Sequence, residues 1–174
     1  AMLLGYKVPL LPVQLLFVNL VTDSFPALCL GMEPPEPDVM SSPGKSRHHA
    51  IFSFSSLFEI ITQGMFLGSL ALTAYLIGGS TMCFAVLSLS QLVHSFNLRS
   101  HHSLLETGLF GNKKLVLSFL LCATLQCLVV ALAPLQSIFH TQSLSGIQWA
   151  IVWLLSLLPV VLVELQKYFN KDLI

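Results

Sequence analysis

The feature that most constrains this chain is a series of apolar stretches, separated by short segments that hold most of the charged residues. Each stretch is ~20 residues long, which is the length of helix that crosses the hydrocarbon core of a bilayer. Of the 174 residues, 55% are hydrophobic and 9% are charged, whereas a soluble domain carries roughly 25% charged residues. The sequence therefore predicts an integral membrane protein whose surroundings are the lipid bilayer. Its net charge of zero argues against a nucleic-acid partner, because binding to phosphates needs an excess of Lys and Arg.

The apolar stretches favour helices over strands. Backbone polar groups inside hydrocarbon must pair within their own segment or in a closed barrel, and these stretches are too long and too continuously apolar for barrel strands. We therefore expect an all-α membrane protein, a bundle of five transmembrane helices. The expected spans cover residues 12–30, 52–77, 80–98, 115–135 and 147–169.

The basic residues indicate the orientation of the spans. Lys7 alone lies on one side, and seven basic residues lie in the connections of the other side: Lys45, Arg47, Arg99, Lys113, Lys114, Lys167 and Lys171. Basic residues mark cytoplasmic connections, so we expect an extracytoplasmic N-terminus and a cytoplasmic C-terminus. An odd number of spans that starts outside the cytoplasm is unusual for a complete protein. We therefore expect the chain to be part of a larger one.

The first span carries a polar stripe in its middle. Asn19 and Asp23 are four residues apart and Thr22 is three from Asn19, which in a regular helix places all three on one face. An ionised Asp in the middle of a membrane span costs at least ~2.5–3.5 kcal/mol. Such a residue needs a compensating partner or a function.

Pro26 follows this stripe and should break the helix. Proline has no N–H for the carbonyl of Thr22 and crowds that carbonyl, and Phe25 before it is biased away from helical geometry. We therefore expect the first helix to be unwound near Asp23–Pro26, with free backbone oxygens beside the carboxylate. Carboxylate, amide and carbonyl oxygens are the ligands that Ca²⁺ prefers, and broken helices at mid-membrane often hold ion sites.

A simpler interpretation is an Asp23 paired with a neighbouring Lys or Arg in a helix that is merely kinked. No other span supplies a Lys or Arg near mid-membrane, which weakens this alternative. An ion site would still need more oxygens than the first span provides.

The run from Pro12 to Pro35 closely resembles the sixth transmembrane helix of type II P-type ATPases, particularly the calcium pumps. The run Gly108-Leu-Phe-Gly-Asn112-Lys113 is similar to the family's loop between helices eight and nine, and similar residues continue through the last two spans. The resemblance covers essentially the whole chain. It implies that the five spans are helices six to ten of a pump.

Several parts of such a pump are absent from this sequence. It has no Asp-Lys-Thr-Gly phosphorylation motif, no Thr-Gly-Glu dephosphorylation motif and no nucleotide-binding domain. The resemblance thus implies that the parent protein is an ATP-hydrolysing enzyme, with ATP and Mg²⁺ bound outside this chain. The expected partners are the first five membrane helices and the cytoplasmic domains, and the chain alone should be inactive.

The resemblance also assigns candidate metal ligands. Asn19 and Asp23 match cation ligands of the family, and Thr22 is a third candidate; the transported ion is Ca²⁺. Two-site calcium pumps have a Glu ligand where this chain has Gln91. The chain is therefore more similar to the single-site pumps of bacteria and of the secretory pathway, and we expect a bacterial plasma membrane.

Two other functions compete with the pump. The chain could be a non-enzymatic membrane anchor or assembly module associated with a pump, or a secondary cation transporter. An Asp-Lys-Thr-Gly motif upstream in the same reading frame would decide for the pump.

Overall fold

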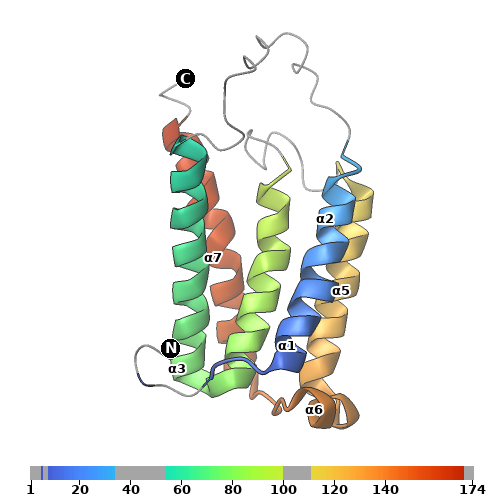
Figure 1. Ribbon diagram of the computed structural model, residues 1–174. Coiled ribbons are helices and arrows are strands. Elements are labelled where there is room, and N and C mark those ends of the chain that lie inside the picture. Colours follow the sequence, from blue (N-terminus) through green and yellow to red (C-terminus); the bar gives the residue numbers. More distant parts are fainter. Residues whose placement is uncertain (1–4, 6–7, 34–53, 100–110, 171–174) are drawn as a thin grey trace.

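The computed structural model describes residue 5 and residues 8–33, 54–99 and 111–170. Within these residues the chain is helical and contains no strand. Figure 1 shows the helices running roughly side by side as a bundle. The predicted all-α membrane fold is confirmed.

The first span is made of three successive helical segments, and the middle one breaks the regular α-helical winding. These are α1 (Pro12–Phe17), the π-helix η2 (Val18–Asp23) and α2 (Ser24–Leu30). Pro12 stands in the first turn of α1, where its missing N–H costs nothing. The break in this helix is the feature that shapes the candidate site.

The next helix, α3 (Phe54–Asn97), contains two of the expected spans. Gly78 and Gly79 have non-helical backbone angles, and Gly79 has φ 69° and ψ −160°, a region that is essentially restricted to glycine. Figure 1 shows the chain reversing its direction here, so the two halves of α3 run antiparallel. Among the described residues, four helices are long and apolar enough to cross a membrane, and the longest of them, Leu57–Asn97, includes this reversal.

The fourth expected span, 115–135, is interrupted in the structure. Helix α5 (Lys113–Ala131) ends at Leu132, and the short helix α6 (Ala133–Phe139) follows. Pro134 lies in the first turn of α6 and has no N–H for the carbonyl of Val130. The side-chain amide of Gln136 donates to that carbonyl at 2.7 Å instead.

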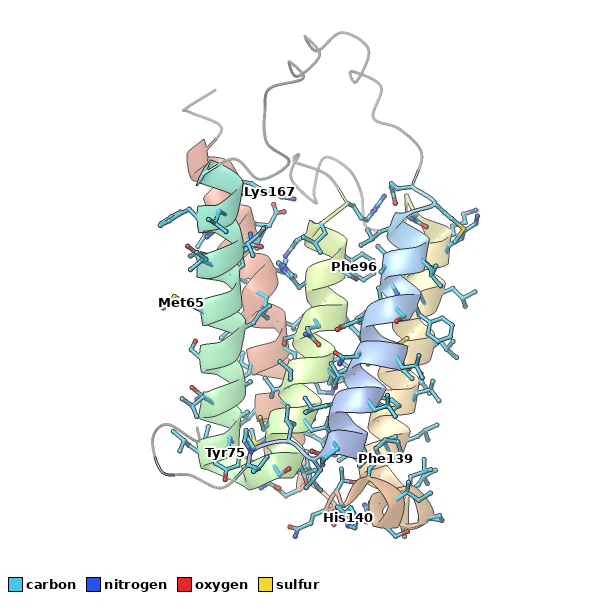
Figure 2. The ribbon with its side chains drawn as sticks, viewed as in Figure 1. Met65, Tyr75, Phe96, Phe139, His140 and Lys167 are labelled. Carbon is cyan, nitrogen blue, oxygen red and sulfur yellow. The ribbon has the colours of Figure 1, made fainter. Side chains whose placement is uncertain are left out.

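The last helix, α7 (Gly146–Asn170), packs mainly against α3, whereas α2 packs mainly against α5. The second half of α3 is the centre of the bundle, and its side chains Met82, Phe84, Leu89 and Leu92 are fully buried. Many large apolar side chains point outward from the bundle, such as Met65 (Figure 2) and Ile147. Exposed apolar surface of this extent suits a bilayer or further helices.

An aromatic cluster joins three elements at the end of the bundle where α6 lies. The ring of Phe17 is 5.8 Å from that of Phe84 and 5.3 Å from that of Phe139, centroid to centroid, and both pairs are edge-on. Phe139 lies beside α1 at this end in Figure 2. This cluster helps to fix the start of the first helix.

Candidate functional site

The break in the first helix lies one turn earlier than the sequence predicts. The wide π-helical turns occupy Val18–Asp23, and a regular α-helix resumes at Ser24 and contains Pro26. The expected unwinding near Asp23–Pro26 is therefore corrected to a π-helix ending at Asp23. We attribute the π-helix to Pro26, which has no N–H to donate. A wide turn inserted before Pro26 changes the pairing between N–H and carbonyl groups just ahead of this gap in the hydrogen bonding.

The backbone oxygens of η2 are engaged by hydroxyl groups of the same helix. The Oγ1 of Thr22 donates to the carbonyl of Val18 at 2.8 Å, and the Oγ of Ser24 donates to the carbonyl of Asn19 at 2.8 Å. These two carbonyls are thus partnered. They lie about one turn before the carbonyl of Thr22, which Pro26 cannot serve because it has no N–H.

The three candidate ligands differ in burial. Asn19 is exposed, Asp23 is half-buried and Thr22 is 1% exposed. The expectation that all three share one face is therefore wrong for Thr22, because the wider turn points its side chain into the bundle. Asn19 and Asp23 remain on the less covered side of η2.

The described residues do not complete a metal site. Within them, no group of three or more His, Cys, Asp or Glu side chains is placed to hold a metal ion. Gln91 is partly buried, and its side-chain Oε1 has no hydrogen-bond partner among the described residues.

The start of the first helix is held by Gln14, whose side chain is fully buried. Its Oε1 accepts from the backbone N–H of Leu11 at 3.0 Å and from the hydroxyl of Ser80 at 3.3 Å. Its Nε2 donates to the carbonyl of Phe139 at 3.0 Å. One amide thus links α1, α3 and the end of α6.

The other end of the first helix is held by Glu33. Its carboxylate accepts hydrogen bonds from Arg99, at the end of α3, and from Asn112, just before α5. The Arg99 guanidinium holds the pKa of the Glu33 carboxyl below its usual value, and the Asn112 bond acts in the same direction against the effect of burial.

Sequence reasoning did not identify Gln14 or the Glu33–Arg99 pair. From the sequence, Arg99 served only to indicate the orientation of the spans in the membrane. The available signal was one acidic and one basic residue just after two spans whose ends are expected on the same side of the membrane.

These elements define a multi-pass membrane protein with a polar break in its first helix. The chain belongs to the cation-transporting ATPases: residues 7–169 match the family described as "Cation transporting ATPase, C-terminus". The resemblance drawn from the sequence is confirmed.

Curated relatives agree with this membership. The chain is 38% identical to "Calcium-transporting ATPase 1" of Bacillus cereus, an alignment that covers 99% of this chain and 22% of the relative. It is 35% identical to "Calcium-transporting ATPase" of Bacillus subtilis, covering 93% of this chain and 19% of that protein. It is 32% identical to "Calcium-transporting ATPase 1" of Lactococcus lactis, an alignment that covers 96% of this chain and 20% of that protein. The chain thus spans about a fifth of the length of these relatives, in the C-terminal membrane region.

Proposed function

We propose that this chain forms the C-terminal membrane helices of an ATP-driven calcium pump, and that Asn19 and Asp23 bind the transported Ca²⁺. The observation that carries the proposal is the placement of a carboxylate and an amide oxygen on the less covered side of a broken helix. Such oxygens are the ligands of Ca²⁺, and the relatives are calcium-transporting ATPases. ATP and Mg²⁺ would act on the rest of the pump, so the chain alone would not hydrolyse ATP.

Thr22 is the third proposed ligand, and it needs a rearrangement. Its hydroxyl donates to the carbonyl of Val18, so its oxygen would reach an ion beside Asp23 only after η2 changes its winding. A π-helical turn is a suitable place for such a change, because π-turns are frequently found at functional sites.

The partner we propose is the remainder of the pump, namely its first five membrane helices and its cytoplasmic domains. Leu16 and Leu20 flank Asn19 on the first helix and are highly exposed, so that side of the helix is open to further helices. On α3, a methyl group added at Gly64 or Gly68 would meet no atom within 4 Å. Glycines four residues apart let another helix approach closely.

The proposed setting is the plasma membrane of a bacterium, with the N-terminus outside the cytoplasm and the C-terminus inside. Four basic residues are described, Arg99, Lys113, Lys114 and Lys167, and all lie toward the end of the bundle where α7 finishes. Basic residues favour the cytoplasmic side, and the relatives named above are bacterial.

The alternative function is a non-enzymatic anchor or assembly module associated with a pump. It would use the same apolar faces but would not need Asp23. The pump function therefore depends on the charge of Asp23, whereas the anchor function does not.

The deciding experiment is Asp23→Asn in the complete pump. This change keeps the size of the side chain and removes the charge that offsets a divalent cation. Phosphorylation from ATP should lose its calcium activation, while phosphorylation from inorganic phosphate, which needs an empty site, should survive. Glu59→Gln is the matched control because Glu59 lies in the first turns of α3. Normal calcium activation in Asp23→Asn would favour the anchor.

A further inference from the structure

The segment that follows α2 is tied to the end of α3 by one largely covered ion pair. The Nη2 and Nε of Arg99 lie 2.8 Å and 3.2 Å from Oε1 of Glu33. The Arg99 side chain is 2% exposed and that of Glu33 is 20% exposed. A pair this well covered is screened much less by water and salt than a surface pair.

Asn112, directly before α5, links this helix to the ion pair of Glu33 and Arg99. Its Nδ2 donates to the second carboxylate oxygen of Glu33 and, at 3.1 Å, to the backbone carbonyl of Cys29. Its Oδ1 accepts from the N–H of Leu115 at 3.0 Å and so caps the start of α5. The same side chain therefore begins α5 and holds the end of α2.

This clamp of Glu33, Arg99 and Asn112 is continuous with the ion-binding helix. The N–H of Glu33 donates to the carbonyl of Leu30 at 3.0 Å, which extends the hydrogen bonding of α2 up to the clamp. The clamp is thus joined through α2 to Asp23, the N-cap of α2.

The wide turn η2 has weaker hydrogen bonds to neighbouring helices than the two ends have, although Val18 and Val21 pack against the core. Thr22 and Ser24 use their hydroxyls on carbonyls of their own helix. The bond from α5 is the thiol of Cys122 donating to the carbonyl of Val21 at 3.4 Å, and a thiol is a weak donor. With Gln14 at one end and the clamp at the other, the first helix has fixed ends and a weakly held centre.

We infer that Glu33, Arg99 and Asn112 are positioning residues for calcium binding: they fix α2 so that rearrangement around the ion is confined to η2. This inference rests on the proposed ion site at Asn19 and Asp23. Releasing the clamp lets α2 shift as a unit, which spreads Asp23 over several positions and weakens binding of the ion. Positional freedom of a ligand lowers affinity because ordering it then counts against binding.

The test uses Glu33→Gln in the complete pump. The variant keeps the size of the side chain and an acceptor oxygen but loses the charge that pairs with Arg99. We expect the calcium concentration for half-maximal phosphorylation from ATP to rise about tenfold, which corresponds to about 1.4 kcal/mol. The maximal level of phosphoenzyme and phosphorylation from inorganic phosphate should stay unchanged.

A double-mutant cycle and a matched control sharpen the test. Arg99→Gln should give a similar shift, and the double variant should be no worse than either single one, since both remove one interaction. Glu164→Gln should not alter the calcium dependence, because Glu164 pairs with Lys167 at 4.0 Å at the same end of the bundle but away from α2.

Two results would overturn the inference. One is an unchanged calcium dependence in Glu33→Gln. The other is an equal loss of phosphorylation from ATP and from inorganic phosphate at unchanged calcium dependence, which would assign the clamp to folding alone. A separate result would contradict the proposed ion site itself, namely normal calcium activation in Asp23→Asn.

Discussion

The side-chain amide of Gln14 donates a hydrogen bond of 3.0 Å to the backbone carbonyl of Phe139, 125 positions further along the chain. Phe139 is the last residue of α6, and the residue after it, His140, has left-handed backbone angles. The last carbonyls of a helix have no partner within the helix and need one from elsewhere. Gln14 supplies this partner while its Oε1 accepts from Leu11 and Ser80.

Replacing Gln14 should therefore destabilise the bundle. Gln14→Met keeps the volume but leaves the N–H of Leu11 and the carbonyl of Phe139 without this partner. An unpaired polar group costs about 1–3 kcal/mol when fully buried and less when it is partly buried, as these two are, so we expect a lower unfolding temperature of the pump in detergent. The exposed Gln142, changed to Met, is the control, and an equal effect of both changes would contradict the role of Gln14.

Replacing Gly79 should lower the stability of the protein because of the backbone conformation at this position. Its φ of 69° and ψ of −160° are strained for any L side chain, so Gly79→Ala should cost about 1–3 kcal/mol. The measurement is thermal unfolding in detergent. Gly146→Ala is the control, since a Cβ there meets nothing within 4 Å; equal stability of both variants would show that the turn adapts.

Glu33 should give the structure a distinct dependence on pH. The hydrogen bonds from Arg99 hold the pKa of its carboxyl below the usual 4.5. A lowered pKa in the folded state stabilises the protein fully above the usual pKa, and this contribution disappears as the pH falls through the lowered value. The difference in unfolding temperature between the native protein and Glu33→Gln should thus be constant above pH 4.5 and shrink below it. A difference that grows on acidification would contradict the assignment.

The proposed orientation can be checked by labelling single cysteines in a background without the four native ones. His140→Cys, in the exposed turn after α6, should react with an impermeant reagent applied to intact cells. Lys113→Cys, at the exposed start of α5, should react only after permeabilisation. The reverse pattern would invert the topology.

The neutral side chain of Gln91 leads to a prediction of the number of bound ions. A Ca²⁺ ion needs about 6–8 oxygens, with carboxylates among them, and Gln91 contributes only a neutral one. Two such ions close together also repel strongly. We therefore expect one Ca²⁺ per complete pump, measured by equilibrium binding of radioactive calcium, and no change in Gln91→Ala. Two ions, the second of which is lost in Gln91→Ala, would identify Gln91 as a ligand.

The helices were largely predictable because their signal is local. Apolar length and the pairing of backbone groups indicate a helical bundle, and the glycine pair at Gly78 marks the reversal inside α3. The break in the first helix was also foreseeable from Pro26. The position of the break was not foreseeable. The helix can widen before Pro26 or unwind at Pro26. We attribute the choice to the hydroxyls of Thr22 and Ser24, which donate to carbonyls of the widened turn.

The sequence by itself determined the membrane class, the family resemblance and the polar character of the first helix, since each depends on composition or on residues a few positions apart. Only the tertiary structure decided that Thr22 points inward and Asn19 outward, and that Glu33 meets Arg99 from 66 positions away. Such pairs depend on how whole helices pack. Hydrophobic patterning limits that packing but does not specify it, because an apolar helix in a bilayer can bury any of several similar faces.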